Sequence, residues 1–216
     1  SSVTEMFQMF FGCGNLISLN LRNFNTSKVT TMLEMFRGCS SLLFLDVSSF
    51  DTSLIDYLGN MFYDCSKLTS LNLSNFNTSR VTAMENMFLG CKLLEILDIS
   101  NFDTTSVCNM GNMFLDCQSI KSIDISHFNT SKVLNMNGMF LNCMSLTSLE
   151  LGKMDTSSVT DMNRMFCNCY ELKSLNLYSF NTINVDVNLI NDDIFYGISN
   201  LRYCINEDIK EEIKSL

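Results

Sequence analysis

Ten cysteines, one histidine and 23 acidic side chains are the groups in this 216-residue sequence that could carry chemistry. Thiolates and imidazoles bind transition metals, thiols pair as disulfides, and paired carboxylates act as general acid and base. His127 lies far along the chain from Cys167 and Cys169, which form the closest cysteine pair. No nucleophile–base pair can be recognised either. The sequence therefore predicts no catalytic residue, no cofactor and no metal site.

Seven of the cysteines recur at a constant interval of 26 residues. They are Cys13, Cys39, Cys65, Cys91, Cys117, Cys143 and Cys169. In stacked coils, neighbouring Cβ atoms would lie about 4.8 Å apart, whereas a disulfide needs about 3.8 Å. We therefore expect a ladder of buried, free thiols that behave as small apolar groups. Cys108 lies outside the ladder, in a slot that other units fill with Thr or Asp, and is expected to be exposed.

Two further series share this interval and its phase. A Met-Phe dipeptide begins at Met9, Met35, Met61, Met87, Met113, Met139 and Met165. A third series is Phe24, Phe50, Phe76, Phe102, Phe128, Met154 and Phe180. Three series in phase predict a solenoid of 26-residue coils.

The pattern within one unit predicts its secondary structure. Leu42, Leu45 and Val47 follow L-x-x-L-x-L, and their alternation indicates a short strand with outward-facing neighbours. Met32 and Met35 are three residues apart, which favours a helical or 3₁₀ turn after a short extended segment. The interval and the leucine pattern are typical of leucine-rich repeats. The predicted fold is an α/β repeat: a right-handed leucine-rich-repeat solenoid with a parallel strand face, a short second strand and helical turns.

The run M-F-x-G-C-x-x-L-x-x-L-x-L-x-x-F-[ND]-T-S-x-V-T-x-M resembles the BspA-like leucine-rich repeat surface proteins, in their 26-residue variety. The likeness covers residues 1 to about 205. It implies an extracellular or cell-surface adhesion module whose ligand is a protein or glycan on another cell or on matrix. An intracellular protein–protein interaction scaffold is the alternative, and it suits ten reduced thiols equally well. The sequence departs from the general repeat where Phe50 replaces an Asn or Cys ladder, so the Asp51/Thr52 series must satisfy the turn backbone instead.

The ends of the chain define two predicted segments. Residues 1–205 form the solenoid, whose first unit begins in mid-repeat, so that preceding repeats are expected. Residues 206–216 are predicted to form a C-terminal capping helix. Between them, Phe195 continues the Met-Phe series after an interval of 29, and Cys204 is placed in the slot of Leu175.

The charge and hydropathy of the chain exclude two classes of partner. With 14 basic and 23 acidic side chains the formal net charge is −9, which argues against nucleic acid binding. No apolar run approaches the roughly 18–20 residues needed to cross a bilayer, so this segment is not expected to insert into a membrane.

The outward-facing residues of the predicted strands form the candidate binding face. Its members are Phe44, Asp46, Asn72, Ile96, Asp98, Asp124, Glu150, Asn176 and Tyr178. Phe44, Ile96 and Tyr178 are the strongest candidates, because exposed apolar side chains often mark binding surfaces. A merely solvated sheet face is the alternative. A hydrolase built on the acids is disfavoured, because flat exposed carboxylates lack a pocket that would raise their pKa.

A second polar column alternates without exception between amide and acid. It consists of Asn25, Asp51, Asn77, Asp103, Asn129, Asp155 and Asn181. Alternation separates the carboxylates by about 10 Å, near one Debye length, so we expect a turn ladder with its charge repulsion relieved. Calcium binding is the weaker alternative, because successive acids lie too far apart to share an ion. Asn25, Asn77 and Asn129 also head Asn-Thr-Ser sequons and are possible glycosylation sites.

Overall fold

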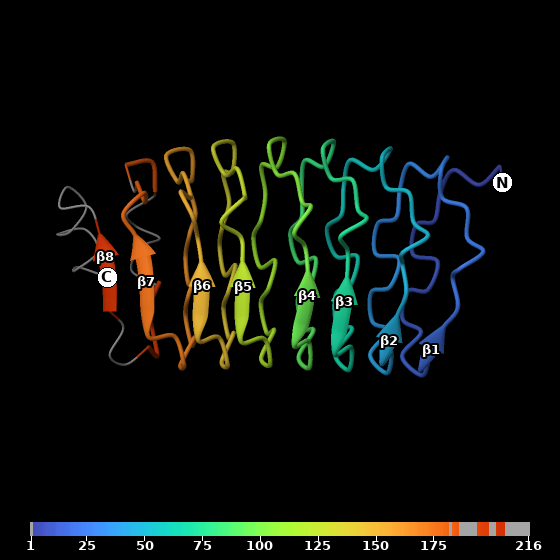
Figure 1. The fold of residues 1–216 in the computed structure, drawn as a ribbon, viewed down its shortest axis with the longest axis horizontal. Coiled ribbons are helices and arrows are strands. Elements are labelled where there is room, and N and C mark those ends of the chain that lie inside the picture. Colours follow the sequence, from blue (N-terminus) through green and yellow to red (C-terminus); the bar gives the residue numbers. More distant parts are fainter. Residues whose placement is uncertain (1, 182, 186–193, 199–201, 206–216) are drawn as a thin grey trace.

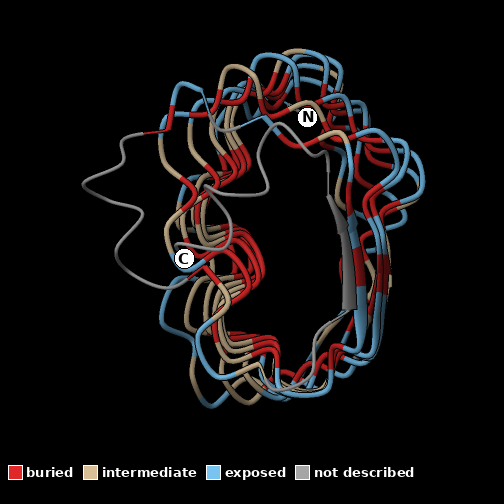
Figure 2. Cartoon of the chain, turned by 90° about the vertical axis from the view of Figure 1, so that its left-hand side faces the viewer, coloured by how far each residue is buried: buried red, intermediate tan, exposed pale blue. Residues whose placement is uncertain are grey.

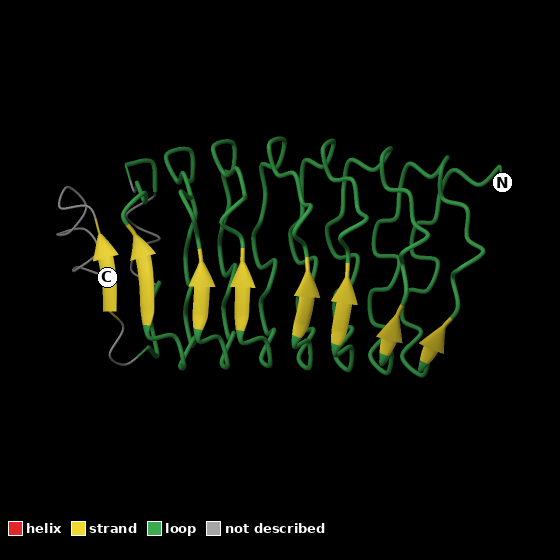
Figure 3. Cartoon of the chain, in the orientation of Figure 1, coloured by secondary structure: helices red, strands yellow, loops and turns green. Residues whose placement is uncertain are grey.

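The chain winds into a solenoid whose coils stack side by side along one long axis (Figure 1). The computed structural model describes residues 2–181, 183–185, 194–198 and 202–205. Each coil contributes one short strand to a common face, and turns and loops make up the rest of the coil (Figure 3). The strands are β1 (Ser18–Leu19), β2 (Phe44–Leu45), β3 (Ser70–Asn72), β4 (Ile96–Asp98), β5 (Ser122–Asp124), β6 (Ser148–Glu150), β7 (Ser174–Leu177) and β8 (Arg202–Ile205).

Strand pairing follows the sequence repeat. The pairs β1–β2, β3–β4, β5–β6 and β7–β8 are parallel. In the first three pairs each residue faces the residue 26 positions later, as Ser70 faces Ile96. The expected second strand is a row of isolated parallel bridges, which joins Tyr57 to Ala83 and Ala83 to Asn109. A repeat solenoid with a parallel strand face is thus confirmed.

The predicted helical or 3₁₀ turn is replaced by a run of separate tight turns. Amides donate to the carbonyl three residues back, as Met35 N does to Met32 O at 3.1 Å and Cys39 N to Phe36 O at 3.1 Å. Glu34 (φ 56°) and Gly38 (φ 75°) lie in the left-handed region, and equivalent residues do so in every coil up to Asn168. A helix cannot continue through such residues. Accordingly, the described residues contain no helix, and so none that could span a membrane.

Buried residues recur at the same places in successive coils (Figure 2), and their apolar side chains form one core that repeats from coil to coil. Its centre is a stack of nearly parallel phenylalanine rings with centroids 5.4–5.8 Å apart and interplanar angles of 1–10°. The stack runs through Phe10, Phe36, Phe62, Phe88, Phe114, Phe140, Phe166 and Phe195. Phe195 therefore occupies the expected slot despite its longer interval.

From Thr26 to Thr156, a threonine ladder satisfies the backbone at one corner of successive coils. Thr26 Oγ1 accepts the Asp51 amide at 2.7 Å and donates to the Asp51 carbonyl at 3.1 Å. The ladder comprises Thr26, Thr52, Thr78, Thr104, Thr130 and Thr156, all buried. The prediction that the Asp51/Thr52 series replaces the usual polar ladder is confirmed, because each hydroxyl bridges to the next coil.

The last strand pair corrects one assignment. In the register of β7 and β8, Leu175 faces Tyr203, and Cys204 faces Asn176. The slot predicted for Cys204 was therefore wrong by one residue, because the chain between Phe195 and β8 is one residue shorter than the repeat requires. The predicted capping helix at 206–216 lies outside the described residues.

Candidate binding site on the strand face

A shallow hollow of about 380 Å³ lies on the strand face over β2, β3 and β4. Five of the nine predicted face residues line it: Phe44, Asp46, Asn72, Ile96 and Asp98. The coils of β2 and β3 add further polar groups to the lining: Ser48, Ser70, Ser74 and Asn75. The solenoid thus brings together side chains that lie up to 54 residues apart in the sequence, from Phe44 to Asp98.

Two large apolar side chains stand on either side of this hollow. Phe44 is 59% exposed and Ile96 is 68% exposed. Both open their strands, and Ser70 occupies the same position in β3 between them. Because neighbouring coils are about 4.8 Å apart, the two apolar walls rise about 10 Å apart with a short hydroxyl between them.

The Asp and Asn residues Asp46, Asn72 and Asp98 of the hollow lie at the end of their strands or directly after it. Asp46 Oδ1 accepts the Ser48 amide at 3.0 Å and the Ser48 hydroxyl at 2.6 Å. Asn72 makes the same pair of bonds with Ser74, at 2.9 and 2.7 Å. We call this set the strand-end column: Asn20, Asp46, Asn72, Asp98, Asp124 and Asn176. This structural role was not among the predictions from the sequence, although the Asx-x-Ser spacing in most of these coils is a signal for it.

The electrostatic state of the column follows from these bonds. Hydrogen bonds from the serine hydroxyl and amide two residues later hold the pKa of Asp46, Asp98 and Asp124 below the ordinary value. Each bonded carboxylate uses Oδ1, and Asp46 Oδ2 lies 3.6 Å from Arg22 Nε. The column is therefore negatively charged throughout the neutral pH range.

The remaining predicted face residues are distributed along the solenoid. Asp124 lines a smaller hollow of about 290 Å³ with Asp98 and His127. Glu150 is exposed on β6 and lies outside the column, because Gly152 (φ 62°) stands two residues later, where most of the other coils have a serine, and has no hydroxyl to donate. Asn176 and Tyr178, the latter 68% exposed, lie three coils and more from the main hollow, in and just after β7. The structure therefore does not bring Tyr178 together with Phe44 and Ile96.

The alternating amide–acid set forms a second, separate column of turns. Asn25 Oδ1 accepts the Ser27 amide at 3.1 Å, and Asp51 Oδ1 accepts the Ser53 amide at 3.0 Å. We call the set the corner column: Asn25, Asp51, Asn77, Asp103, Asn129, Asp155 and Asn181. The turn-ladder prediction is confirmed. The three sequon asparagines are exposed, and their glycosylation stays a prediction.

The cysteines form the predicted ladder of free thiols. Cys39, Cys65, Cys91, Cys117, Cys143 and Cys169 are buried, and each donates its S–H to a phenylalanine carbonyl at 3.1–3.3 Å. Burial raises the pKa of the Cys39 thiol to about 11 and that of Cys169 to about 12. Cys108 is exposed as predicted, and Cys13 in the first coil is exposed as well. Within the described residues, no group of His, Cys, Asp or Glu is arranged to hold a metal ion.

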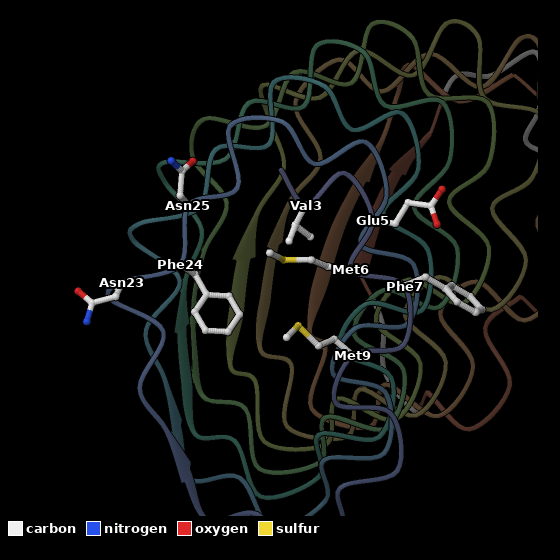
Figure 4. A pocket seen from close by; sticks show the side chains of 8 residues that line it. All are labelled: Val3, Glu5, Met6, Phe7, Met9, Asn23, Phe24 and Asn25. Carbon is white, nitrogen blue, oxygen red and sulfur yellow. The ribbon is translucent and has the colours of Figure 1, made fainter. Parts of the chain in front are cut away.

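The first coil carries another hollow, of about 580 Å³, where the core column meets solvent (Figure 4). Val3, Met6 and Phe24 point into the coil, whereas Glu5 and Phe7 point away from it. These inward side chains occupy the same slots as buried residues of later coils. This hollow is therefore continuous with the apolar core of the first described coil and differs in kind from the one on the strand face.

Comparison with known proteins places the chain in a family. Residues 1–95, 67–174 and 109–209 match the family described as "Mycoplasma protein of unknown function, DUF285". The chain belongs to this family. No curated protein matches it. The overlapping matches of this DUF285 chain span nearly its whole length, as expected for a family whose unit is a repeat.

A solved structure supports the fold of this DUF285 chain. The crystal structure of a T. pallidum leucine-rich repeat protein (TpLRR) is 21% identical, with a TM-score of 0.50. The similarity covers 79% of this chain and 72% of that one. The likeness supports a leucine-rich-repeat-like solenoid, consistent with the parallel strand face described above.

Proposed function

We propose that this DUF285-family chain is a non-catalytic protein-binding module that holds its partner against the strand face. The observation that carries the proposal is the hollow between Phe44 and Ile96, two exposed apolar side chains two coils apart. Exposed apolar side chains around a concave, otherwise polar surface are typical of interaction sites. Solenoids in general present such extended surfaces to macromolecular partners.

The acids of the strand face favour binding over hydrolysis. A general acid at neutral pH needs a carboxyl group whose pKa is raised, usually by burial in an apolar pocket. The carboxyl groups of Asp46, Asp98 and Asp124 have the opposite shift, because serine donors stabilise their charged form. Three permanently charged acids suit recognition of a partner better than proton transfer.

We place this module at the cell surface or in the extracellular space, as an adhesion module of the BspA-like kind. The support is the resemblance of its 26-residue unit to that class. Its partner would be a protein or glycan on another cell or on matrix. The second candidate is an intracellular scaffold, which the ladder of free, buried thiols favours, because thiols persist in reducing compartments.

A binding experiment with matched variants tests the module. The labelled chain is applied to arrays of purified matrix proteins, glycans and cytosolic proteins. Phe44→Ser/Ile96→Ser should reduce binding at least about tenfold, as expected when central apolar anchors are lost. Leu93→Ser/Leu134→Ser removes two other exposed apolar side chains, 47% and 50% exposed, and should bind as the parent does. Equal binding by all three proteins would contradict the proposal.

Localisation is tested on cells that produce the protein. Antibody should label intact cells if the module lies at the surface. Labelling only after permeabilisation would contradict the surface assignment and favour the scaffold.

A further inference from the structure

The hollow on the strand face has an apolar side chain on either side where the strands begin, and a carboxylate next to each of them where the strands end. Phe44 and Ile96 form the walls, and Asp46 and Asp98 lie two residues further along the same coils. Side chains two residues apart on a strand point to the same face. Each apolar wall therefore has a carboxylate beside it on the surface that a partner would meet.

Asp46 and Asp98 differ in whether a basic residue of the same chain lies close to the carboxylate. Arg22 reaches Asp46 from the preceding coil, with Nε 3.6 Å from Oδ2 and a side chain that is 79% exposed. This contact shows that a guanidinium can approach the strand-end column from the solvent side. In the part of the chain that the structure describes, no lysine or arginine makes an ion pair with Asp98.

We propose, building on the protein-binding function proposed above, that the partner inserts a lysine or arginine side chain between Phe44 and Ile96. Its aliphatic stem would lie between the two apolar walls. Its cationic group would lie close to the carboxylates of Asp98 and Asp46. Lysine and arginine bury their stems along apolar surface and keep the charge in a polar setting. A cation against the face of Phe44 would add a cation–π contribution.

Other side chains fit this hollow less well. A partner carboxylate would face Asp46 and Asp98 and be repelled by a chain whose net charge is −9. A leucine or phenylalanine would cover the carboxylates without pairing them, and desolvation of an unpaired charge is costly. The combination of apolar walls and charge therefore selects a basic side chain.

The structure offers a matched pair of variants for the test. Asp46→Asn/Asp98→Asn removes two charges from the hollow, and Asp51→Asn/Asp103→Asn removes two from the corner column of the same coils. Asparagine already makes the same hydrogen bond in both columns, since Asn72 Oδ1 accepts the Ser74 amide and Asn77 Oδ1 accepts the Ser79 amide. Both variants therefore keep their turns, and both have the same net charge.

The probe is a fluorescein-labelled hexalysine peptide, with its fully acetylated counterpart as the uncharged control. Binding is followed by fluorescence anisotropy at low salt, where surface charges are least screened. Asp46→Asn/Asp98→Asn should weaken binding about three- to tenfold, as expected for two partly exposed ion pairs. Asp51→Asn/Asp103→Asn should bind hexalysine as the parent does, and acetylated hexalysine should bind far more weakly. Equal weakening by both variants, no weakening by either, or no binding to the parent would overturn the inference.

The same variants separate this inference from the proposed function. Suppose that an array partner loses binding with Phe44→Ser/Ile96→Ser but not with Asp46→Asn/Asp98→Asn. The protein-binding function then stands, and the inference that the partner inserts a basic side chain is wrong. If neither variant changes binding to any array partner, the proposed function fails as well.

Discussion

At the scale of single residues, the phenylalanine stack contributes much of the packing. Phe88 is fully buried, with ring centroids 5.8 Å from Phe62 and 5.5 Å from Phe114. Phe88→Ala should lower the free energy of unfolding by about 3–5 kcal/mol, because it removes a large core side chain and leaves a cavity. Phe44→Ala, on the exposed strand face, should change it little. Denaturant melts of the two variants measure the difference, and equal effects would contradict the role of the stack.

Thiol reactivity should differ sharply among residues of one type. Cys108 is exposed, whereas Cys91, Cys117 and Cys143 are fully buried and burial raises their pKa. A thiol reagent should therefore label Cys108 within minutes in the native protein and spare the other three until denaturant is added. Mass spectrometry of labelled peptides follows the reaction. Disulfides between successive ladder cysteines would disprove the free-thiol ladder.

At the scale of the structural element, each coil is tied to the next by a buried hydroxyl. Thr78 Oγ1 accepts the Asp103 amide at 2.7 Å and donates to its carbonyl at 2.9 Å. Thr78→Val keeps the shape but leaves both groups unpaired, and should cost about 1–3 kcal/mol of unfolding free energy. Thr78→Ser retains the hydroxyl and should cost less. A thermal or denaturant melt in which Val and Ser variants are equally stable would argue against the ladder.

The carboxylates of the corner column should make the stability of the fold depend on pH in acidic solution. Bonds from the residue two positions later hold the pKa of Asp51, Asp103 and Asp155 below the ordinary value of 3.8. Because the folded-state pKa is the lower one, these groups stabilise the fold above about pH 4, and the contribution is lost as the pH falls further. Melting temperature should therefore be insensitive to these groups between neutral pH and about pH 5 and should drop below pH 4.

The triple variant Asp51→Asn/Asp103→Asn/Asp155→Asn is the control for that pH profile. Its amide oxygens keep the turns, as Asn77 and Asn129 do in neighbouring coils. Its melting temperature should fall less steeply in acid than that of the parent. A profile parallel to that of the parent would show that the corner acids do not stabilise the fold.

At the scale of the whole molecule, the coils form a one-dimensional array in which each contacts only its neighbours. The first described coil is less covered than the central ones: Met9 is 49% exposed, whereas its equivalents Met87 and Met113 are fully buried. Amide hydrogen exchange should therefore be fastest around Met9 and slowest at Phe88 and Phe114, whose amides donate to the next coil. Uniform protection along the chain would contradict this gradient and indicate one cooperative unit.

The sequence determined the architecture of this protein because a constant interval places equivalent residues in equivalent environments. Coil length, strand position, the inward phenylalanines and thiols, the threonine ladder and the exposure of Cys108 could all be predicted from slots 26 residues apart. Burial distinguishes the apolar slots and follows from the apolar pattern, whereas the threonine slot is identified by a hydroxyl that can bond the turn backbone.

Only the tertiary structure decided features that depend on contacts between coils or on the sign of φ. Residues such as Glu34 and Arg164 adopt left-handed φ with no glycine to signal it, so the expected helical turns become separate tight turns. The register of β8 likewise depends on pairing with β7 rather than on the local pattern. The hollow exists because stacking places Phe44 and Ile96 on either side of Ser70. Side chains 52 residues apart can form a site only after the chain has coiled.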